Sequence, residues 1–200
     1  MVTTRLPVVP SGAECSLDHC YLGEGTQLML RRVPIYRGTV IEVAIETVAL
    51  PNAAQADLEV VRHPGGAAVV ALNADDRVCL LRQYRHAADG WIWELPAGKL
   101  APGEPPLICA QRELAEEAQV RGSRWRALGC ILSSPGVLTE RIHLFLAQDL
   151  APACGEIEAH EVLEVHWLPF AEALAWAQSG KIADAKTLVG LYRAQSLMAG

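Results

Sequence analysis

Three glutamates within five residues, Glu113, Glu116 and Glu117, are the strongest chemical signal in this sequence. On an α-helix, residues three or four positions apart share one face, so these carboxylates would converge. Arg112 precedes them but would point about 100° away around the helix. We therefore expect no positive group on the helix to neutralise the cluster. Fixed carboxylate oxygens suit Mg²⁺ or Mn²⁺, and a solvated acidic face is the other interpretation of the same pattern.

A helix must position these glutamates, and the sequence predicts one over residues 105–118. Apolar residues recur at helical spacing and would pack one side of this helix on a core. They are Leu107, Ala110, Leu114 and Ala118. Pro105 and Pro106 suit the first turn, where the fixed φ of proline is already helical. At Gln119, glycine would more easily adopt the left-handed conformation that ends a helix. We expect Gln119 to adopt it at about 1 kcal/mol, or the helix to end differently.

The flanks of this helix complete a longer pattern. The pattern begins with a glycine, continues with a glutamate after five residues, and ends with R-E-aliphatic-x-E-E-x-G-aliphatic after seven more. The sequence matches it at eight positions. These are Gly98, Glu104, Arg112, Glu113, Leu114, Glu116, Glu117 and Val120. The sole departure is Gln119, which stands where the pattern has its last glycine. The stretch resembles the Nudix box, whose hydrolases use divalent cations to cleave a nucleoside diphosphate linked to another moiety.

The resemblance implies a role for each polar residue of the box. The catalytic metal, Mg²⁺ or Mn²⁺, would be bound by the carbonyl of Ala97 and by the carboxylates of Glu113, Glu116 and Glu117. Glu104 would pair with Arg112, and this pair would brace the loop that begins at Gly98 against the helix.

The likeness extends over roughly residues 40–195 and points to the ADP-ribose pyrophosphatase group. It is carried by "LLRQYRHAADGWIWELPAGKL", by "SSPGVLTERIHLFLA" and by Pro135, which lies sixteen residues after Gln119, the position of the last glycine of the pattern. The resemblance implies that Arg85 and Pro135 contact the substrate, and the fork of an arginine suits anionic oxygens. It implies Glu161 as the general base. Glu140, which would also contact substrate, is the second candidate for the base.

The implied reaction is hydrolysis of the diphosphate of a nucleoside diphosphate sugar, with ADP-ribose giving AMP and ribose 5-phosphate. The same motifs allow a pyrophosphatase for GDP-mannose or ADP-glucose. A non-catalytic domain that senses ADP-ribose is disfavoured, because such proteins usually lose box glutamates or carry a DNA-binding domain. An enzyme for oxidised nucleotides is disfavoured by Pro135 and by the β-rich N-terminal segment.

The remaining elements predict an α/β (α+β) fold, an α/β/α sandwich with a mixed sheet and an N-terminal β-rich segment. Strands are expected over 39–50, 56–61, 67–72, 77–84, 125–132, 141–150 and 162–169, and closing helices over 170–182 and 184–199. The second of these helices would begin after Asp184, a good N-cap. The strands at 67–72 and 77–84, joined by "NADD", predict a hairpin with a buried middle.

The strand at 39–50 alternates apolar and acidic residues. Its apolar residues Val43 and Ile45 would form the buried face, and Glu42 and Glu46 the opposite face.

The sequence divides into an N-terminal arm and β segment, residues 1–57, and a Nudix hydrolase domain, residues 58–200. The resemblance implies a homodimer in which the N-terminal β segments contribute to the partner's site. Tyr36 is a candidate to stack on adenine, and Arg37 and Arg62 are candidates to bind substrate.

Composition limits the partners and the compartment. A formal charge of −6 and the absence of a basic run argue against nucleic acid. No apolar stretch approaches the ~20 residues of a membrane span, and the N-terminus lacks the apolar core of a signal peptide. We therefore expect a cytoplasmic protein without membrane contact. The cysteines form no C-x-x-C pair and are expected to be buried thiols: Cys15, Cys20, Cys79, Cys109, Cys130 and Cys154.

Overall fold

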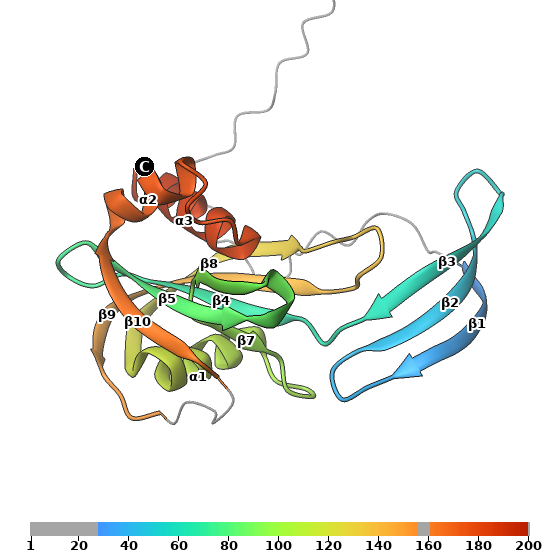
Figure 1. The fold of residues 1–200 in the computed structure, drawn as a ribbon, viewed down its shortest axis with the longest axis horizontal. Coiled ribbons are helices and arrows are strands. Elements are labelled where there is room, and N and C mark those ends of the chain that lie inside the picture. The colour runs from blue at the N-terminus through green and yellow to red at the C-terminus, as the bar shows by residue number, and fades with distance from the viewer. Residues whose placement is uncertain (1–27, 156–160, 200) are drawn as a thin grey trace, which may run out of the picture.

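In the computed structural model, which describes residues 28–155 and 161–199, the strands form three sheets (Figure 1). The antiparallel N-terminal sheet has the order β1 (Leu28–Arg37), β2 (Glu42–Ala49), β3 (Gln55–Arg62). A mixed sheet has the order β7 (Ala97–Lys99), β4 (Gly66–Ala71), β9 (Arg141–Pro152), β8 (Val120–Leu132), and its β4 and β9 run parallel. The third sheet has the order β10 (Leu163–Pro169), β5 (Arg77–Arg85), β6 (Gly90–Glu94). The helices are η1 (His86–Ala88), a short 3-10 turn, then α1 (Pro106–Ala118), α2 (Phe170–Gln178) and α3 (Ala185–Met198).

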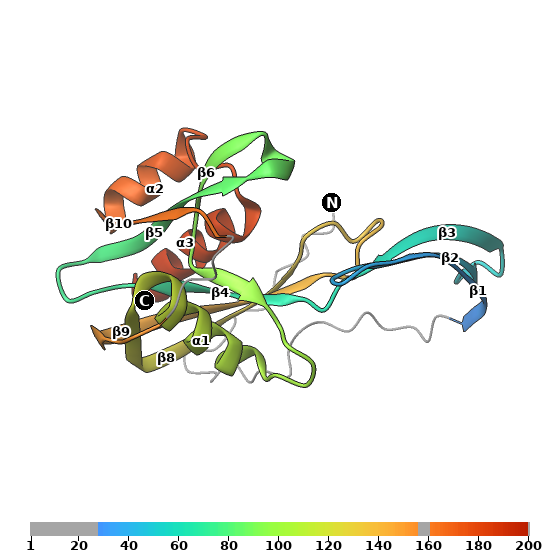
Figure 2. The ribbon, with the colours of Figure 1, turned by 60° about the horizontal axis from the view of Figure 1, so that its bottom comes forward.

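The second and third sheets lie between α1 on one side and α2 with α3 on the other (Figures 1 and 2). Successive residues of a strand point to opposite faces, and β4 is buried along its whole length. Its residues Ala67 and Val69 pack in the apolar cluster of α1, whereas Ala68 and Val70 pack in the cluster of α2 and α3. The predicted α/β/α sandwich with a mixed sheet is confirmed.

The predicted hairpin of residues 67–72 and 77–84 is wrong, because β4 and β5 belong to different sheets. Only the isolated bridge between Leu72 and Val78 pairs them beside the turn. The side-chain oxygen of Asn73 holds this turn by accepting hydrogen bonds from the N–H groups of Asp75 (3.0 Å) and Arg77 (2.9 Å). Both strands are apolar on both faces, so their sequence fixes their burial but not their pairing partners.

The N-terminal sheet projects away from the sandwich in both views (Figures 1 and 2). Its burial is opposite to the prediction, since Val43 and Ile45 are only partly buried while Glu46 is 6 % exposed. Two arginines from the flanking strands cover Glu46: Arg32 Nε lies 3.4 Å and Arg62 Nη2 2.6 Å from its Oε1. A carboxylate with two ion pairs can be buried where an unpaired one cannot.

Helix α1 begins and ends as its sequence predicts. Pro106 occupies its first position, after Pro105 in an extended conformation. Gln119 ends the helix with φ 54° and ψ 35°, the left-handed conformation that glycine adopts most easily. The carbonyl of Gln119 accepts a hydrogen bond from Ala153 N (2.9 Å), which ties this helix end to the end of β9.

Helix α3 begins after Asp184, whose side chain accepts hydrogen bonds from both the N–H and the hydroxyl of Thr187. The predicted N-cap is therefore confirmed. The Thr187 hydroxyl in turn accepts a hydrogen bond from Leu95 N (2.9 Å), so the start of α3 is fastened to the end of β6. No helix in the described part of the chain has the length and apolar character needed to span a membrane.

Burial of the cysteines agrees with the prediction at Cys79 and Cys109 and disagrees at Cys154, which is exposed just beyond β9. Cys130 is partly buried. Cys15 and Cys20, like the whole arm of residues 1–27, lie outside the described residues.

Candidate active site

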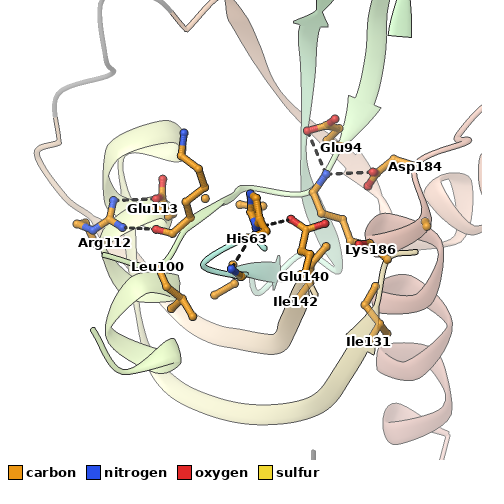
Figure 3. A pocket seen from close by; sticks show the side chains of 18 of the residues that line it. His63, Glu94, Leu100, Arg112, Glu113, Ile131, Glu140, Ile142, Asp184 and Lys186 are labelled. Carbon is orange, nitrogen blue, oxygen red and sulfur yellow. Dashed lines mark hydrogen bonds and ion pairs between the residues drawn. The ribbon is translucent and has the colours of Figure 1, made fainter. Parts of the chain in front are cut away.

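A pocket of about 670 Å³ opens where the ends of several elements meet (Figure 3). Its walls come from the β3–β4 connection, the ends of β5, β6 and β7, helix α1, the β8–β9 loop and the start of α3. Among its lining residues are most of those predicted from the sequence: Arg85, Ala97, Gly98, Arg112, Glu113, Glu116, Glu140 and Glu161. Pro135 is exposed and does not line it, although Ser133 in the same loop does.

The glutamates of α1 do not form a solvated face. Glu113 is 7 % exposed and Glu117 is 1 % exposed, which is far less than an ordinary surface glutamate. Glu116 is partly exposed at the pocket. Burial raises the pKa of Glu113, and the negative charges of Glu116 and Glu161 raise it further, against the opposing effect of Arg112.

The expectation that Arg112 leaves the cluster alone is wrong. Its Nη1 lies 2.7 Å from Glu113 Oε1 and 2.9 Å from Glu116 Oε2. Its Nε and Nη2 donate to the two oxygens of Glu104 at 3.0 and 3.1 Å, which confirms the predicted brace between loop and helix. The Cα–Cβ direction of Arg112 points away, but the side chain is long enough for its guanidinium to fold back along the helix. Its pKa is raised, mainly by the hydrogen bonds of Glu104.

Glu117 lies deepest and has the least complete set of partners. Its Oε2 accepts a hydrogen bond from Ala97 N (2.8 Å), whereas its Oε1 is buried without any hydrogen-bond partner. Burial raises the pKa of this carboxyl to about 8, with the charges of Glu113 and Glu161 adding to the effect. A buried oxygen without a partner is costly, and a cation would remove that cost. The acidic oxygens around it are the ligands that hard divalent ions prefer.

In the described part of the chain, no three His, Cys, Asp or Glu side chains are grouped as metal ligands in their present positions. Arg112 occupies oxygens of both Glu113 and Glu116. Arg112 contacts one oxygen of each carboxylate, Glu113 Oε1 and Glu116 Oε2, so the second oxygen of each is not bound to Arg112.

Gly98 leaves the space that the Glu113 carboxylate fills. A Cβ at this position would overlap the Glu113 carboxylate. Beside it, the Cys109 thiol contacts the carbonyls of Gly98 (3.6 Å) and Lys99 (3.4 Å), and burial raises its pKa to about 12. Any other residue at position 98 would therefore displace the Glu113 carboxylate from its present position.

Arg85 also lines the pocket and is held by Glu94 (labelled in Figure 3), whose Oε2 lies 2.7 Å from Arg85 Nη2. Glu94 also contacts Lys186 Nζ (3.2 Å), which reaches Asp184 Oδ1 (3.0 Å). Burial acts to raise the pKa of Glu94, but the hydrogen bonds and charges of Arg85 and Lys186 outweigh it and lower the pKa. Sequence reasoning missed Glu94 and Lys186 as pocket residues, although "WELPAG" and "DAKTL" adjoin the motifs it used.

The two candidate bases enter from different loops. Glu161, just before β10, lies close enough for its charge to affect Arg85, Glu113 and Glu117. Glu140, at the end of the β8–β9 loop, faces His63 with its Oε1 3.3 Å from Nδ1. The structure places both at the pocket.

The N-terminal candidates lie apart from the pocket. Tyr36 is exposed on β1, and Arg37 is exposed beside it. Arg62 is engaged with Glu46. None of the three lines the pocket within this chain.

Known proteins resemble this chain in family pattern, in sequence and in structure. The model of the NUDIX domain matches residues 62–188. An ADP-ribose pyrophosphatase of Bacillus subtilis (strain 168) is 36% identical over 155 residues, 76% of this chain and 84% of the relative. A GDP-mannose pyrophosphatase of Cronobacter sakazakii (strain ATCC BAA-894) is 38% identical over 157 residues, 70% of this chain and 81% of the relative. The crystal structure of an ADP compounds hydrolase matches with a TM-score of 0.76 over 88% of this chain and 96% of that chain. At 21% identity, this match supports the fold alone.

Proposed function

The chain belongs to the Nudix family, and from that membership we propose that it hydrolyses the diphosphate of a nucleoside diphosphate sugar. The preferred substrate in this proposal is ADP-ribose, and the products are AMP and ribose 5-phosphate. The observation that carries the proposal is the acidic side of α1, which faces a pocket that Arg85 also lines. The B. subtilis relative, an ADP-ribose pyrophosphatase, supports the choice of substrate.

The residues fit a divalent cation, which we propose to be Mg²⁺ or Mn²⁺, by their oxygen ligands and by the unpartnered Oε1 of Glu117. The ligands would be the carbonyl of Ala97 and the carboxylates of Glu113, Glu116 and Glu117. When bound, such an ion neutralises phosphate charge and makes water a stronger acid.

Arg85 would bind the anionic oxygens of the diphosphate. Its ion pair with Glu94 holds the guanidinium at the pocket wall, while part of the fork stays available because the side chain is 41% exposed. Arg112 and Glu104 would hold the loop that begins at Gly98 in position against the helix. Most of the rate acceleration would then come from alignment and charge stabilisation, as in other phosphoryl transfers.

Glu161 would take the proton of the attacking water as its oxygen bonds to phosphorus, and the bond from that phosphorus to the bridging oxygen breaks. Glu140 is the second candidate for this step. Glu161 is favoured because its charge acts on Glu113 and Glu117, where the water would be activated.

A sugar-nucleotide pyrophosphatase acting on GDP-mannose or ADP-glucose is the second candidate function. The C. sakazakii relative favours it by its name and by its identity to this chain. A domain that binds ADP-ribose without cleaving it is disfavoured, because all three box glutamates face the pocket or lie beneath it.

We further propose that the chain acts as a homodimer and that residues 1–57 form its dimerising segment. The projecting sheet supports this, since it exposes apolar side chains that a second copy would cover: Leu28, Met29, Leu30, Val33, Ile35, Tyr36 and Val40. Tyr36 and Arg37, which lie away from the pocket of their own chain, would then be available to the partner's pocket. We propose no nucleic-acid partner, in keeping with the charge of −6.

The test is hydrolysis of ADP-ribose, GDP-mannose, ADP-glucose, NADH and diadenosine polyphosphates, each with Mg²⁺, Mn²⁺ or EDTA. The expected result is the highest kcat/KM for ADP-ribose, with AMP and ribose 5-phosphate as products and no turnover in EDTA. A higher kcat/KM for GDP-mannose or ADP-glucose would replace the first proposal by the second. Glu117→Gln should lower kcat by at least about two orders of magnitude with the fold retained, and near-wild-type turnover would remove Glu117 from the ligand set.

A further inference from the structure

His63 is a pocket residue that lies outside the Nudix box and outside the other motifs read from the sequence. It lies between β3 and β4, its side chain is 13% exposed, and it lines the pocket. Figure 3 shows it facing Glu140 between two charged groups: the Arg112–Glu113 pair on one side and the Glu94–Lys186–Asp184 chain on the other. His63 therefore stands where the projecting sheet joins the pocket.

The backbone around His63 is fastened to the β8–β9 loop. Val61 N donates to the carbonyl of Val137 (2.7 Å), and Thr139 N donates to the carbonyl of Val61 (3.0 Å). His63 N donates to the hydroxyl of Thr139 (3.0 Å). These bonds fix the end of β3 beside the segment that leads into Glu140.

The ring of His63 has one nitrogen with two competing partners. Its Nδ1 lies 3.1 Å from Gly65 N, which is a donor, and 3.3 Å from Glu140 Oε1. A neutral Nδ1 with a lone pair serves Gly65, while a protonated Nδ1 serves the Glu140 carboxylate. The second contact is attractive only when a proton lies between ring and carboxyl group. Leu100 N holds Gly65 by donating a hydrogen bond to its carbonyl (3.1 Å), and the φ of +86° at Gly65 favours glycine.

We infer that His63 is a positioning residue for Glu140, and that it connects the end of the N-terminal sheet to the substrate-facing side of the pocket. Its backbone is held by the β8–β9 loop, and with a proton on Nδ1 its ring donates to the carboxylate at the end of that loop. The inference rests on the proposed hydrolysis, in which Glu140 contacts substrate or serves as the base. It adds a residue outside the Nudix box to the groups on which the reaction depends.

Two substitutions separate this role from a merely structural one. In His63→Asn, the amide offers both a donor and an acceptor near the position of Nδ1, whereas in His63→Gln it lies near the position of Nε2. His63→Gln should lower kcat/KM for ADP-ribose about tenfold, through the same constant, kcat or KM, that Glu140→Gln changes. His63→Asn should stay within about threefold of wild type. His143→Gln, at a partly buried histidine of β9 outside the pocket, is the matched control and should leave both constants unchanged.

A double-mutant cycle then tests the pair directly. His63→Gln combined with Glu140→Gln should be no slower than Glu140→Gln alone. The shifts in Tm of the two single variants should likewise fail to add. The inference would be overturned if the effects of the two single variants on kcat/KM multiply in the double variant. Equal losses in His63→Asn and His63→Gln would also overturn it. If wild type hydrolyses none of the substrates, the proposed function fails, and additive Tm shifts would then reject the His63–Glu140 contact independently.

Discussion

At the residue scale, Glu117 is a carboxyl group whose surroundings favour its neutral form until a cation binds. It is 1 % exposed, and one of its oxygens lacks a partner. Sequence spacing predicts its place on the helix, because i, i+3 and i+4 positions share a face. The same rule puts Arg112 beside Glu116, four residues later, so this contact follows from spacing that the prediction overlooked. The contact of Arg112 with the adjacent Glu113 depends on a side-chain rotamer that spacing leaves open.

The pKa of Glu117 predicts a pH-dependent stability of the metal-free protein. Because burial raises this pKa from 4.5 to about 8, the folded state binds a proton more tightly than the unfolded state. This carboxyl therefore favours folding most below pH 4.5, and that contribution is lost as pH rises toward 8. In EDTA, wild type should lose stability relative to Glu117→Gln between pH 5 and pH 8, by on the order of a few kcal/mol.

Thermal unfolding of both proteins at pH 5, 6.5 and 8 in EDTA measures this difference. Mg²⁺ or Mn²⁺ at pH 8 should raise the Tm of wild type more than that of Glu117→Gln. A Tm difference that is constant across this pH range would show that Glu117 is ionised in the folded protein throughout.

At the element scale, α1 and the loop before it act as one unit. Arg112 and Glu104 join them, and the Glu113 carboxylate fills the space beside Gly98. Gly98→Ala should displace that carboxylate and lower kcat by about tenfold or more, because small misplacements of reacting groups are costly. Steady-state kinetics over a range of Mg²⁺ concentrations would show the loss of kcat, together with weaker binding of Mg²⁺.

Gly103→Ala, in the same loop, is the control for Gly98→Ala. Its φ of +75° is strained for alanine, but nothing lies within 4 Å of the added Cβ. It should cost about 1 kcal/mol of unfolding free energy and leave kcat unchanged. If both variants lose activity alike, general loosening of the loop, and not overlap with Glu113, is the cause.

The end of α1 carries a separate prediction. Gln119 holds a left-handed conformation in which glycine is less strained, so Gln119→Gly should raise the free energy of unfolding by about 1 kcal/mol. Turnover should stay unchanged, because Gln119 supplies no ligand to the pocket. Urea unfolding and kcat measure the two effects, and Gln119→Ala, which keeps the strain, should not be stabilised. A large change in turnover would show that this helix end matters to the site.

The helices with clear start signals are predicted well, whereas the pairing of β4 with β5 and the buried face of β2 are not. Helix α1 follows from its 3.6-residue apolar spacing and its prolines, and α3 follows from its Asp184 cap. The pairing of β4 and β5 was wrong because continuous apolar runs carry no register. The buried face of β2 was wrong because two arginines from other strands neutralise Glu46, and such a contact is absent from the local pattern.

At the scale of the whole molecule, the pocket is assembled from segments spread between His63 and Lys186. The Nudix box identifies its family from a short pattern. Glu94, Lys186 and His63 were missed as pocket residues, because their positions depend on how β6, α3 and the β3–β4 connection meet in space. The spacing of residues along the sequence does not encode the contacts between these elements.

The projecting sheet predicts a dimer that charge can disrupt. Val33 and Tyr36 lie on its partly exposed apolar face, opposite Ile45 and Val43 in the strand register. Val33→Lys with Tyr36→Lys should convert a dimer of twice the 21.6 kDa chain mass into monomer, by burying charge at the interface. Sedimentation equilibrium measures the mass. Tyr192→Lys, at a similarly exposed position on α3, should remain dimeric, and a monomeric wild type would refute the dimer.

The parallel pairing of β4 with β9, and the contact of Lys186 with Glu94, also affect when activity can arise during synthesis of the chain. The strand at 66–71 cannot complete its sheet until residues 142–147 have left the ribosome, and such non-local pairing is slow. The glutamate helix leaves the ribosome long before Lys186, which contacts the Glu94 partner of Arg85 and lines the pocket. A nascent chain therefore exposes its acidic helix before its pocket is complete.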